Sequence, residues 1–139
     1  MSEKIDDMHL TIYTDGACWG NPGPAAIGAI IKDQQGTLIR ISEYIGLGTN
    51  NRAEYSAVIK ALSEAIKLNP DEVTLYLDSE LVVRQLTGRY RVKSKSILPL
   101  YVEVSELLEK FAKVSVVHVP RECNAEADAL ATAALHSKA

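Results

Sequence analysis

Long apolar runs are absent from this sequence of 139 residues. No stretch approaches the roughly 20 apolar residues that a helix needs to span a bilayer. Residues 1–7 are largely polar and acidic and lack the apolar core of a signal peptide. These absences argue against a membrane protein and against a secreted one, and we expect a cytoplasmic protein.

Cysteine is scarce, and positive charge is not in excess. Cys18 and Cys123 are the two cysteines, and their separation does not match a metal-ligand spacing. Free thiols are more common than a disulfide in a chain of this class. Both cysteines fall in predicted loops, so a disulfide between them stays open. The formal net charge is −3, so binding of nucleic acid would have to rest on a local patch.

Internal repeats, linkers and low-complexity segments are absent as well. The composition, 47% apolar and 24% charged, is that of an ordinary globular protein. The chain is long enough to bury a core without a disulfide or metal staple. We therefore predict a single domain over residues 1–139, in which residues 1–8 form a flexible N-terminal extension.

The hydrophobic pattern predicts an antiparallel meander followed by alternating helices and strands. Residues 16–24 are rich in glycine and proline and predict a turn, and Asn124 is the expected N-cap of the last helix. The predicted strands are residues 10–15, 25–32, 37–46, 72–78 and 113–119, and the predicted helices are residues 49–68, 79–86, 97–112 and 124–136. This order indicates one mixed α/β sheet with helices packed on it.

Two of the predicted strands end in the same pattern. One reads Thr-x-Tyr-x-Asp from Thr11 to Asp15, and the other reads the same from Thr74 to Asp78. Because side chains alternate along a strand, the Thr, Tyr and Asp of each share one face. If the two strands are parallel neighbours, both aspartates lie at the carboxyl edge of the sheet, where open α/β sheets place their ligands.

Two further carboxylates lie on apolar helix faces. Glu54 is in line with Val58 and Leu62 in the first turn of its helix, and Asp128 is in line with Ala131 near the start of the last helix. Each acid has an ordinary explanation by itself. An Asp often ends a strand in a turn, and an acid in the first turn of a helix complements the helix dipole.

Taken together, four acids at one sheet edge would repel one another and raise one another's pKa values unless a cation neutralises them. Oxygen ligands suit Mg²⁺ or Mn²⁺ and not zinc. Carboxylates that hold two ions roughly 4 Å apart and leave coordination positions open are the parts of two-metal phosphoryl transfer. A single cation that only stabilises the fold is the alternative, and it explains fewer of these placements.

The four acids lie in four motifs, which are Asp15-Gly-Ala-Cys-Trp-Gly-Asn-Pro-Gly-Pro-Ala25, Thr49-Asn-Asn-Arg-Ala-Glu54, Leu77-Asp-Ser79 and Asn124-Ala-Glu-Ala-Asp-Ala-Leu-Ala131. Together these motifs resemble the ribonuclease H type 1 family. The similarity extends over nearly the whole chain, with the motifs in the family's order and spacing. It implies the ribonuclease H-like fold, whose five-stranded mixed sheet has three antiparallel strands, then parallel strands, and helices on both faces.

The resemblance also implies an activity, the endonucleolytic cleavage of the RNA strand of an RNA–DNA hybrid to 5′-phosphate and 3′-hydroxyl ends. We expect the protein to be a monomer. It implies two Mg²⁺ ions, for which Mn²⁺ is the expected substitute. In this scheme Asp15 bridges both ions, Asp128 joins it on the nucleophile side, and Glu54 and Asp78 hold the other ion. Glu54 would also lie near the 2′-hydroxyl, the group that distinguishes RNA from DNA.

The same resemblance implies a set of substrate contacts. Small residues let the backbone approach the minor groove of a hybrid, amides donate and accept there, and Thr49 would hold a phosphate of the DNA strand. Helix capping is a competing explanation for Asn50 or Asn51, and Arg52 either contacts phosphate or buttresses the acids. The candidate substrate-binding residues are Gly16, Asn21, Thr49, Asn50, Asn51 and Arg52.

A basic patch follows the second predicted helix, and residues 84–95 contain no acid. Its members are Arg84, Arg89, Arg91, Lys93 and Lys95. A solvated loop is the usual explanation for such a run. On a net acidic protein that must hold a polyanion, we favour contact with the nucleic-acid backbone.

The sequence departs from the family in two places. Some members have a longer, strongly basic helical segment after the second helix, and its shortness here implies a modest, salt-dependent affinity for the hybrid. Many members have a Gly-His pair before the last helix, whose His assists the attacking water or product release. Here His118 lies in a strand-like Val-His-Val setting that favours a packed side chain, so Arg121 and Glu122 are alternative candidates for this auxiliary role.

Three other functions fit less well. A phosphatase with an Asp nucleophile would need a second Asp where Ala17 stands. The Asn50-Asn51-Arg52 motif and the short chain disfavour a transposase or junction resolvase, which are other Mg²⁺-dependent nucleases of the same superfamily. A non-catalytic nucleic-acid-binding module on this fold would be expected to have lost an acid, and none of the four is missing.

Overall fold

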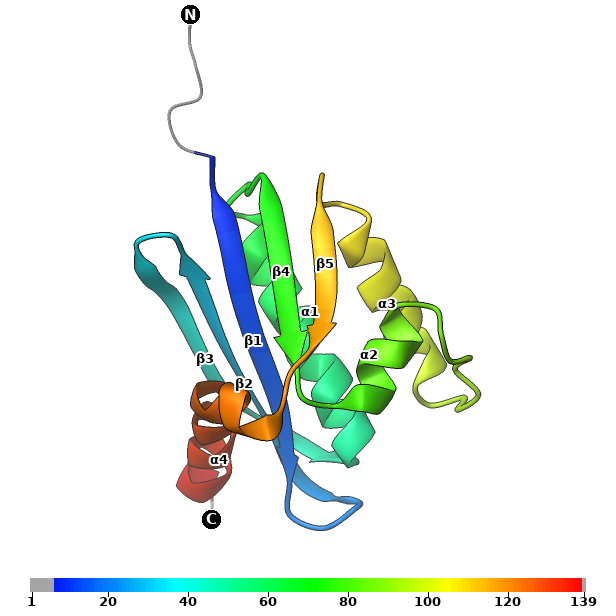
Figure 1. Ribbon diagram of the computed structural model, residues 1–139. Helices are drawn as coiled ribbons and strands as arrows, with labels where there is room; N and C mark the ends of the chain where they lie inside the picture. Colours follow the sequence, from blue (N-terminus) through cyan, green and yellow to red (C-terminus); the bar gives the residue numbers. More distant parts are fainter. Residues whose placement is uncertain (1–6, 139) are drawn as a thin grey trace, which may run out of the picture.

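A five-stranded sheet forms the centre of the computed structural model, which describes residues 7–138 (Figure 1). Its strands are β1 (His9–Cys18), β2 (Gly23–Asp33), β3 (Gly36–Gly48), β4 (Glu72–Leu77) and β5 (Val114–His118). They lie in the order β3-β2-β1-β4-β5. β1, β2 and β3 are antiparallel neighbours, whereas β4 and β5 run parallel to β1. This arrangement confirms the predicted mixed sheet.

Helices lie on both faces of the sheet, as predicted (Figure 1). They are α1 (Asn50–Ile66), α2 (Glu80–Leu86), α3 (Leu98–Leu108) and α4 (Ala125–Lys138), with a 3₁₀ turn, η1 (Arg121–Asn124), before α4. α1 packs on β1 and β2 with α3 against it, and α4 packs on the opposite face over β1, β2 and β3. None of the helices in the described part of the chain is long and apolar enough to cross a bilayer.

The main core lies between the sheet and α1. Leu10 and Ile12 of β1 are fully buried against it, while Tyr13 points to the other face and is half-buried. The ring of Tyr13 stacks there on that of Tyr76 of β4, with centroids 4.9 Å apart. The buried residues of α1 recur at helical spacing: Ala53, Tyr55, Ala57, Val58, Ala61, Leu62 and Ala65.

β1 is longer than predicted. Its pairing with β2 continues past Asp15 to Cys18, and β2 itself begins at Gly23, so the predicted turn over residues 16–24 is wrong at both of its ends. Glycine suggested a turn at Gly16, but its lack of a side chain serves packing, because a Cβ there would lie 2.5 Å from the carbonyl carbon of Ala53. Gly16 thus allows the start of α1 to pack directly on β1.

Several helix boundaries also differ from the prediction, by one to four residues. α3 ends at Leu108 rather than at residue 112, because the chain turns there to bury Phe111 in the core before entering β5. α4 begins at Ala125 and continues to Lys138. Asn124 is not its cap, because the Asn124 side chain is buried and bonded to other segments.

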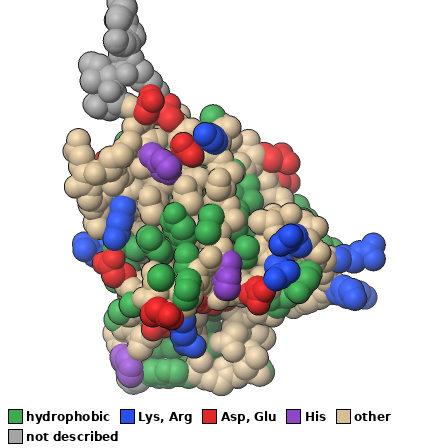
Figure 2. Space-filling model, in the orientation of Figure 1, with side chains coloured by type: hydrophobic (Ala, Val, Ile, Leu, Met, Phe, Trp, Pro, Cys, Tyr) green, Lys and Arg blue, Asp and Glu red, His purple; other side chains and the backbone are tan. Residues whose placement is uncertain are grey.

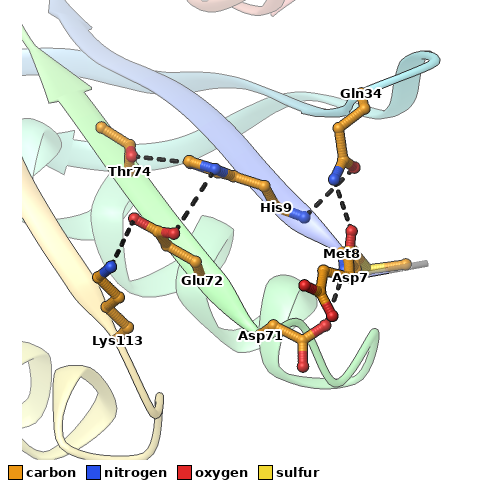
Figure 3. A network of polar contacts seen from close by, with 8 residues as sticks. All are labelled: Asp7, Met8, His9, Gln34, Asp71, Glu72, Thr74 and Lys113. Carbon is orange, nitrogen blue, oxygen red and sulfur yellow. Dashed lines mark hydrogen bonds and ion pairs between the residues drawn. The ribbon is translucent and has the colours of Figure 1, made fainter. Parts of the chain in front are cut away.

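The start of the described chain is tied to the sheet (Figure 3). The N–H of Met8 donates to Oδ2 of Asp71 at 2.7 Å, and the carbonyl of Met8 accepts from the N–H groups of Asp71 and Glu72. His9 follows, with Nε2 3.0 Å from Oγ1 of Thr74 and Nδ1 3.8 Å from Glu72. The predicted flexible extension over residues 1–8 is therefore wrong for Met8, and its residues 1–6 lie outside the described residues.

Candidate active site

Asp15 and Asp78 lie just past the end of the parallel pairing between β1 and β4. The last pair of that register is Tyr13 with Tyr76, so each aspartate follows two residues later at the carboxyl edge of the sheet. Asp15 is 5% exposed, and its Oδ1 accepts the N–H of Gly16 at 3.0 Å. The parallel register that the two Thr-x-Tyr-x-Asp patterns required is confirmed.

Glu54 reaches the same point from α1. The hydroxyl of Thr49 caps this helix by accepting the N–H of Arg52 at 3.2 Å, and the helix start packs against β1 at Gly16. Carboxylate oxygens of Asp15, Glu54 and Asp78 all lie within 4.8 Å of one another. The structure thus brings together three of the four predicted acids in one tight cluster.

Asp128 approaches from the opposite face of the sheet. α4 packs closely on β2 at Gly28, where a Cβ would lie 2.1 Å from the carbonyl oxygen of Ala127. Because Gly28 pairs with Asp15 across the β1–β2 ladder, this contact places Asp128 beside Asp15, whose pKa it raises. Gly28 was not predicted from the sequence, although a glycine inside an apolar strand signals a close approach.

Burial and mutual repulsion both act against negative charge at this site. The pKa of Asp15 is raised from 3.8 to about 7, chiefly because burial removes water from its carboxylate, and Asp78 and Asp128 add to the shift. Burial, followed by the charges of Asp15 and Asp78, raises the pKa of Glu54 well above its ordinary value. No ion pair within residues 7–138 involves any of the four acids.

A hard divalent cation fits this set of donors. Every donor is a carboxylate oxygen, which Mg²⁺ and Mn²⁺ accept readily. Oε1 of Glu54 is buried without a hydrogen-bond partner, which is costly unless a further group satisfies it. A cation would also offset the repulsion that raises the pKa values of Asp15 and Glu54. Asp15, Glu54 and Asp78 can therefore hold a metal ion.

An open hollow gathers most of the predicted substrate-binding residues. It is lined by Asn21, Thr49, Asn50, Asn51, Ser94, Ser96 and Ile97. Oδ1 of Asn21 accepts the N–H of Asn50 at 3.0 Å, which joins the β1–β2 turn to the start of α1. Capping of α1 falls to Thr49 and not to Asn50 or Asn51. Ser94 and Ser96 were not predicted, because Ser94 stands inside the run that we assigned to charge alone and Ser96 directly follows it.

The basic patch divides into two parts. Arg84 is bound to Glu80 by hydrogen bonds of 2.6 and 2.9 Å, and its guanidinium lies 5.3 Å from the ring centre of Tyr90. The other members are exposed on the segment between α2 and α3: Arg89, Arg91, Lys93 and Lys95. Figure 2 shows basic side chains projecting at the side of the molecule where this segment lies. Arg84 is predicted to belong with them only because the intervening stretch contains no acid.

His118 lies in different surroundings from those expected, and Cys18 ends strand β1 instead of lying in the expected loop. His118 is exposed at the end of β5 and lines an open hollow with Glu80 and Arg84, so the packed side chain that its setting favoured is wrong. Arg121 and Glu122 are exposed in η1. Cys18 and Cys123 are both free thiols, as their number favoured.

The chain matches known proteins over nearly its whole length. Residues 13–134 match a family described as reverse transcriptase-like. Ribonuclease HI of Halobacterium salinarum is 44% identical over 124 residues, which are 88% of this chain and 62% of that protein. A bifunctional protein of Mycobacterium tuberculosis is 40% identical over 134 residues, which are 95% of this chain and 37% of that protein. The chain thus spans less than two thirds of either of these relatives.

Solved structures agree with the sequence matches. Ribonuclease H1 from Halobacterium salinarum superimposes with a TM-score of 0.89 at 42% identity, over 93% of this chain and 98% of that one. The ribonuclease H1 named LC11, solved in complex with an RNA/DNA hybrid, superimposes with a TM-score of 0.86 at 41% identity over the same shares. On this fold, this identity and this coverage, the chain belongs to the ribonuclease H type 1 family.

Proposed function

We propose that this protein is an endoribonuclease that hydrolyses the RNA strand of RNA–DNA hybrids with two Mg²⁺ ions, for which Mn²⁺ can substitute. The observation that carries the proposal is the convergence of Asp15, Glu54 and Asp78, whose oxygens lie within 4.8 Å of one another at the carboxyl edge of the sheet. The likeness to a ribonuclease H1 solved with an RNA/DNA hybrid supports the substrate class. Because the chain spans only part of its curated relatives, the proposal concerns the activity of this domain.

The four acids would bind the two metal ions in different combinations. Asp15 lies on the central strand beside the other three, which suits a ligand shared by both ions. Asp128 would join it on the nucleophile side, and Glu54 and Asp78 would hold the other ion. When bound, the ions supply the charge that activates a water and stabilises the leaving oxygen. The products would carry 5′-phosphate and 3′-hydroxyl ends.

Three groups of side chains would hold the hybrid. The hollow around Thr49 offers hydroxyl and amide donors to a phosphate oxygen. Glu54, at the start of the same helix, would lie near the 2′-hydroxyl. The exposed cations of the basic patch would attract the backbone and make affinity dependent on salt. Arg52 stays a candidate for phosphate contact, and His118, Arg121 and Glu122 stay candidates for the auxiliary role.

Labelling each strand of a hybrid in turn tests the proposal. With Mg²⁺ or Mn²⁺ present, we expect internal cuts in the RNA strand alone, products that a 5′-phosphate-dependent exonuclease degrades, and no cuts with EDTA. The matched duplex of two DNA strands should stay intact. Binding of the hybrid without cleavage would indicate the non-catalytic module instead, and cleavage of the DNA duplex would indicate another nuclease of the superfamily.

Three further expectations accompany this function. We propose that residues 1–139 act as one ribonuclease H domain, that the working form is a monomer and that its location is the cytoplasm. Light scattering of the purified chain would test the second of these.

A further inference from the structure

We propose that Asn124 is a positioning residue that orients Asp78 and fixes it relative to Asp15 and Asp128. This inference rests on the proposed metal-dependent function. Asn124 is 1% exposed and lies at the end of η1, directly before α4. Its place in the sequence suggested a helix cap, but its side chain turns away from α4 toward the ends of β1 and β4.

The carboxamide of Asn124 joins three segments that are far apart in sequence. Its Nδ2 donates to the carbonyl of Thr14 at 2.8 Å and to Oδ2 of Asp78 at 3.0 Å. A carboxamide NH₂ carries two hydrogens, so both are used. An Asp in this place would lack donors when ionised, and an Ala would lack them in any state.

The two hydrogen bonds of Asn124 lie where they can fix the position of Asp78 relative to Asp15. The β1–β4 ladder ends with Tyr13 and Tyr76, so no pair of that ladder fixes the distance between the residues that follow. Asn124 supplies a connection at this point, because one of its partners directly precedes Asp15 and the other is Asp78 itself.

The same residue also bears on the fourth acid. Asp128 follows Asn124 by one turn of α4, so a side chain that anchors the start of this helix also fixes the origin from which Asp128 projects. Oδ1 of Asn124 is buried without a hydrogen-bond partner, which is unfavourable for the fold by itself. The side chain is therefore oriented for its two donor contacts at the cost of an unpaired acceptor.

Mg²⁺ binding to the protein without substrate tests this role, with Asn124→Ala compared against Ser42→Ala. Ser42 is a matched control because its hydroxyl donates to the carbonyl of Leu130 at 2.6 Å and so also ties α4 to the sheet, without a hydrogen bond to any of the four acids. We expect Asn124→Ala to raise the midpoint of a Mg²⁺ titration followed by NMR by about 10-fold to 100-fold, the range for residues that orient metal ligands. Ser42→Ala should leave the midpoint unchanged.

Two more measurements separate positioning from folding. If Asn124→Ala does not fold, as judged by thermal unfolding in EDTA, Asn124→Ser retains a single donor and should raise the midpoint in the same direction. In an Asp78→Asn background the effect of Asn124→Ala on the midpoint should become much smaller, because only the part that acts through Asp128 remains. A midpoint that Asn124→Ala leaves unchanged, or an effect that persists in full without the Asp78 carboxylate, would overturn the inference. A wild-type protein that binds Mg²⁺ as expected but leaves hybrids intact would contradict the proposed function alone.

Discussion

Asp15 is the residue whose charge is affected by all three of the other acids in the site. It is 5% exposed on the central strand, and three other carboxylates act on it. Without a cation, the folded protein favours a proton on this group, which is why its pKa lies near 7 rather than 3.8. The fold thus keeps a carboxylate whose negative charge is destabilising at a fixed place, which is expected where a bound ligand offsets that charge.

Replacing Asp15 by Asn should stabilise the metal-free protein more as the pH rises. The folded-state pKa of Asp15 is raised above its unfolded value, so its contribution to stability is fully present below about pH 4 and is lost as the pH rises through about 7. The difference in free energy of unfolding between Asp15→Asn and wild type, measured in EDTA, should therefore grow by ~2–4 kcal/mol between pH 4 and pH 8. A difference that stays flat or shrinks over this range would contradict the repulsion among the acids.

At the scale of elements, close packing of a helix on a strand positions the acids. α1 approaches β1 at Gly16, and α4 approaches β2 at Gly28, on opposite faces of the sheet. Each approach carries a carboxylate: Glu54 follows the contact on α1, and Asp128 follows the contact on α4. A change at either glycine should therefore affect the metal site as well as stability.

Gly28→Ala should separate α4 from β2. The new Cβ would lie 2.1 Å from a backbone oxygen and 2.5 Å from the backbone nitrogen of Ala131, and backbone cannot move aside as a side chain can. We expect a loss of about 1–3 kcal/mol in stability from overpacking and a larger Mg²⁺ requirement for cleavage. Gly48→Ala is the control, because its Cβ would meet nothing closer than 3.6 Å. Equal effects of the two substitutions would refute the packing argument.

The segment between α2 and α3 should contribute affinity and not chemistry. Its exposed cations project from the side of the molecule (Figure 2), so each cation that contacts a phosphate contributes about one unit to the slope of log affinity against log salt. Lys93→Ala and Lys95→Ala should each weaken hybrid binding and reduce that slope by about 1, with an unchanged kcat. Lys67→Ala removes a cation that pairs with Glu64 on α1 and serves as the control. If it weakens hybrid binding as much as Lys93→Ala does, the effect comes from net charge and not from a contact of this segment.

At the scale of the whole molecule, the features that could be predicted from the sequence are those that depend on the periodicity of its residues. The alternation in residues 10–15 and 72–78 determined the faces, and the repeated Thr-x-Tyr-x-Asp pattern determined the register that brings Asp15 near Asp78. Contacts that depend on side-chain direction were not predictable in this way. The amide of Asn124 could have capped a helix but instead donates to Asp78, and Arg84 could have faced solvent but instead binds Glu80. Both side-chain directions depend on which residues lie nearby in the folded protein, and the sequence pattern does not show this.

Cleavage of a uniform RNA–DNA hybrid by wild-type protein and by Asp15→Asn, at increasing Mg²⁺, decides whether the cluster of acids is the catalytic centre. We predict that wild-type protein cuts the RNA strand in proportion to bound Mg²⁺. Asp15→Asn, although folded by thermal unfolding, should cut at least about 1,000-fold more slowly, a loss of ~4 kcal/mol of transition-state stabilisation. A folded Asp15→Asn protein that retains appreciable Mg²⁺-dependent cleavage would contradict the assignment of this cluster to the metal and to the chemistry.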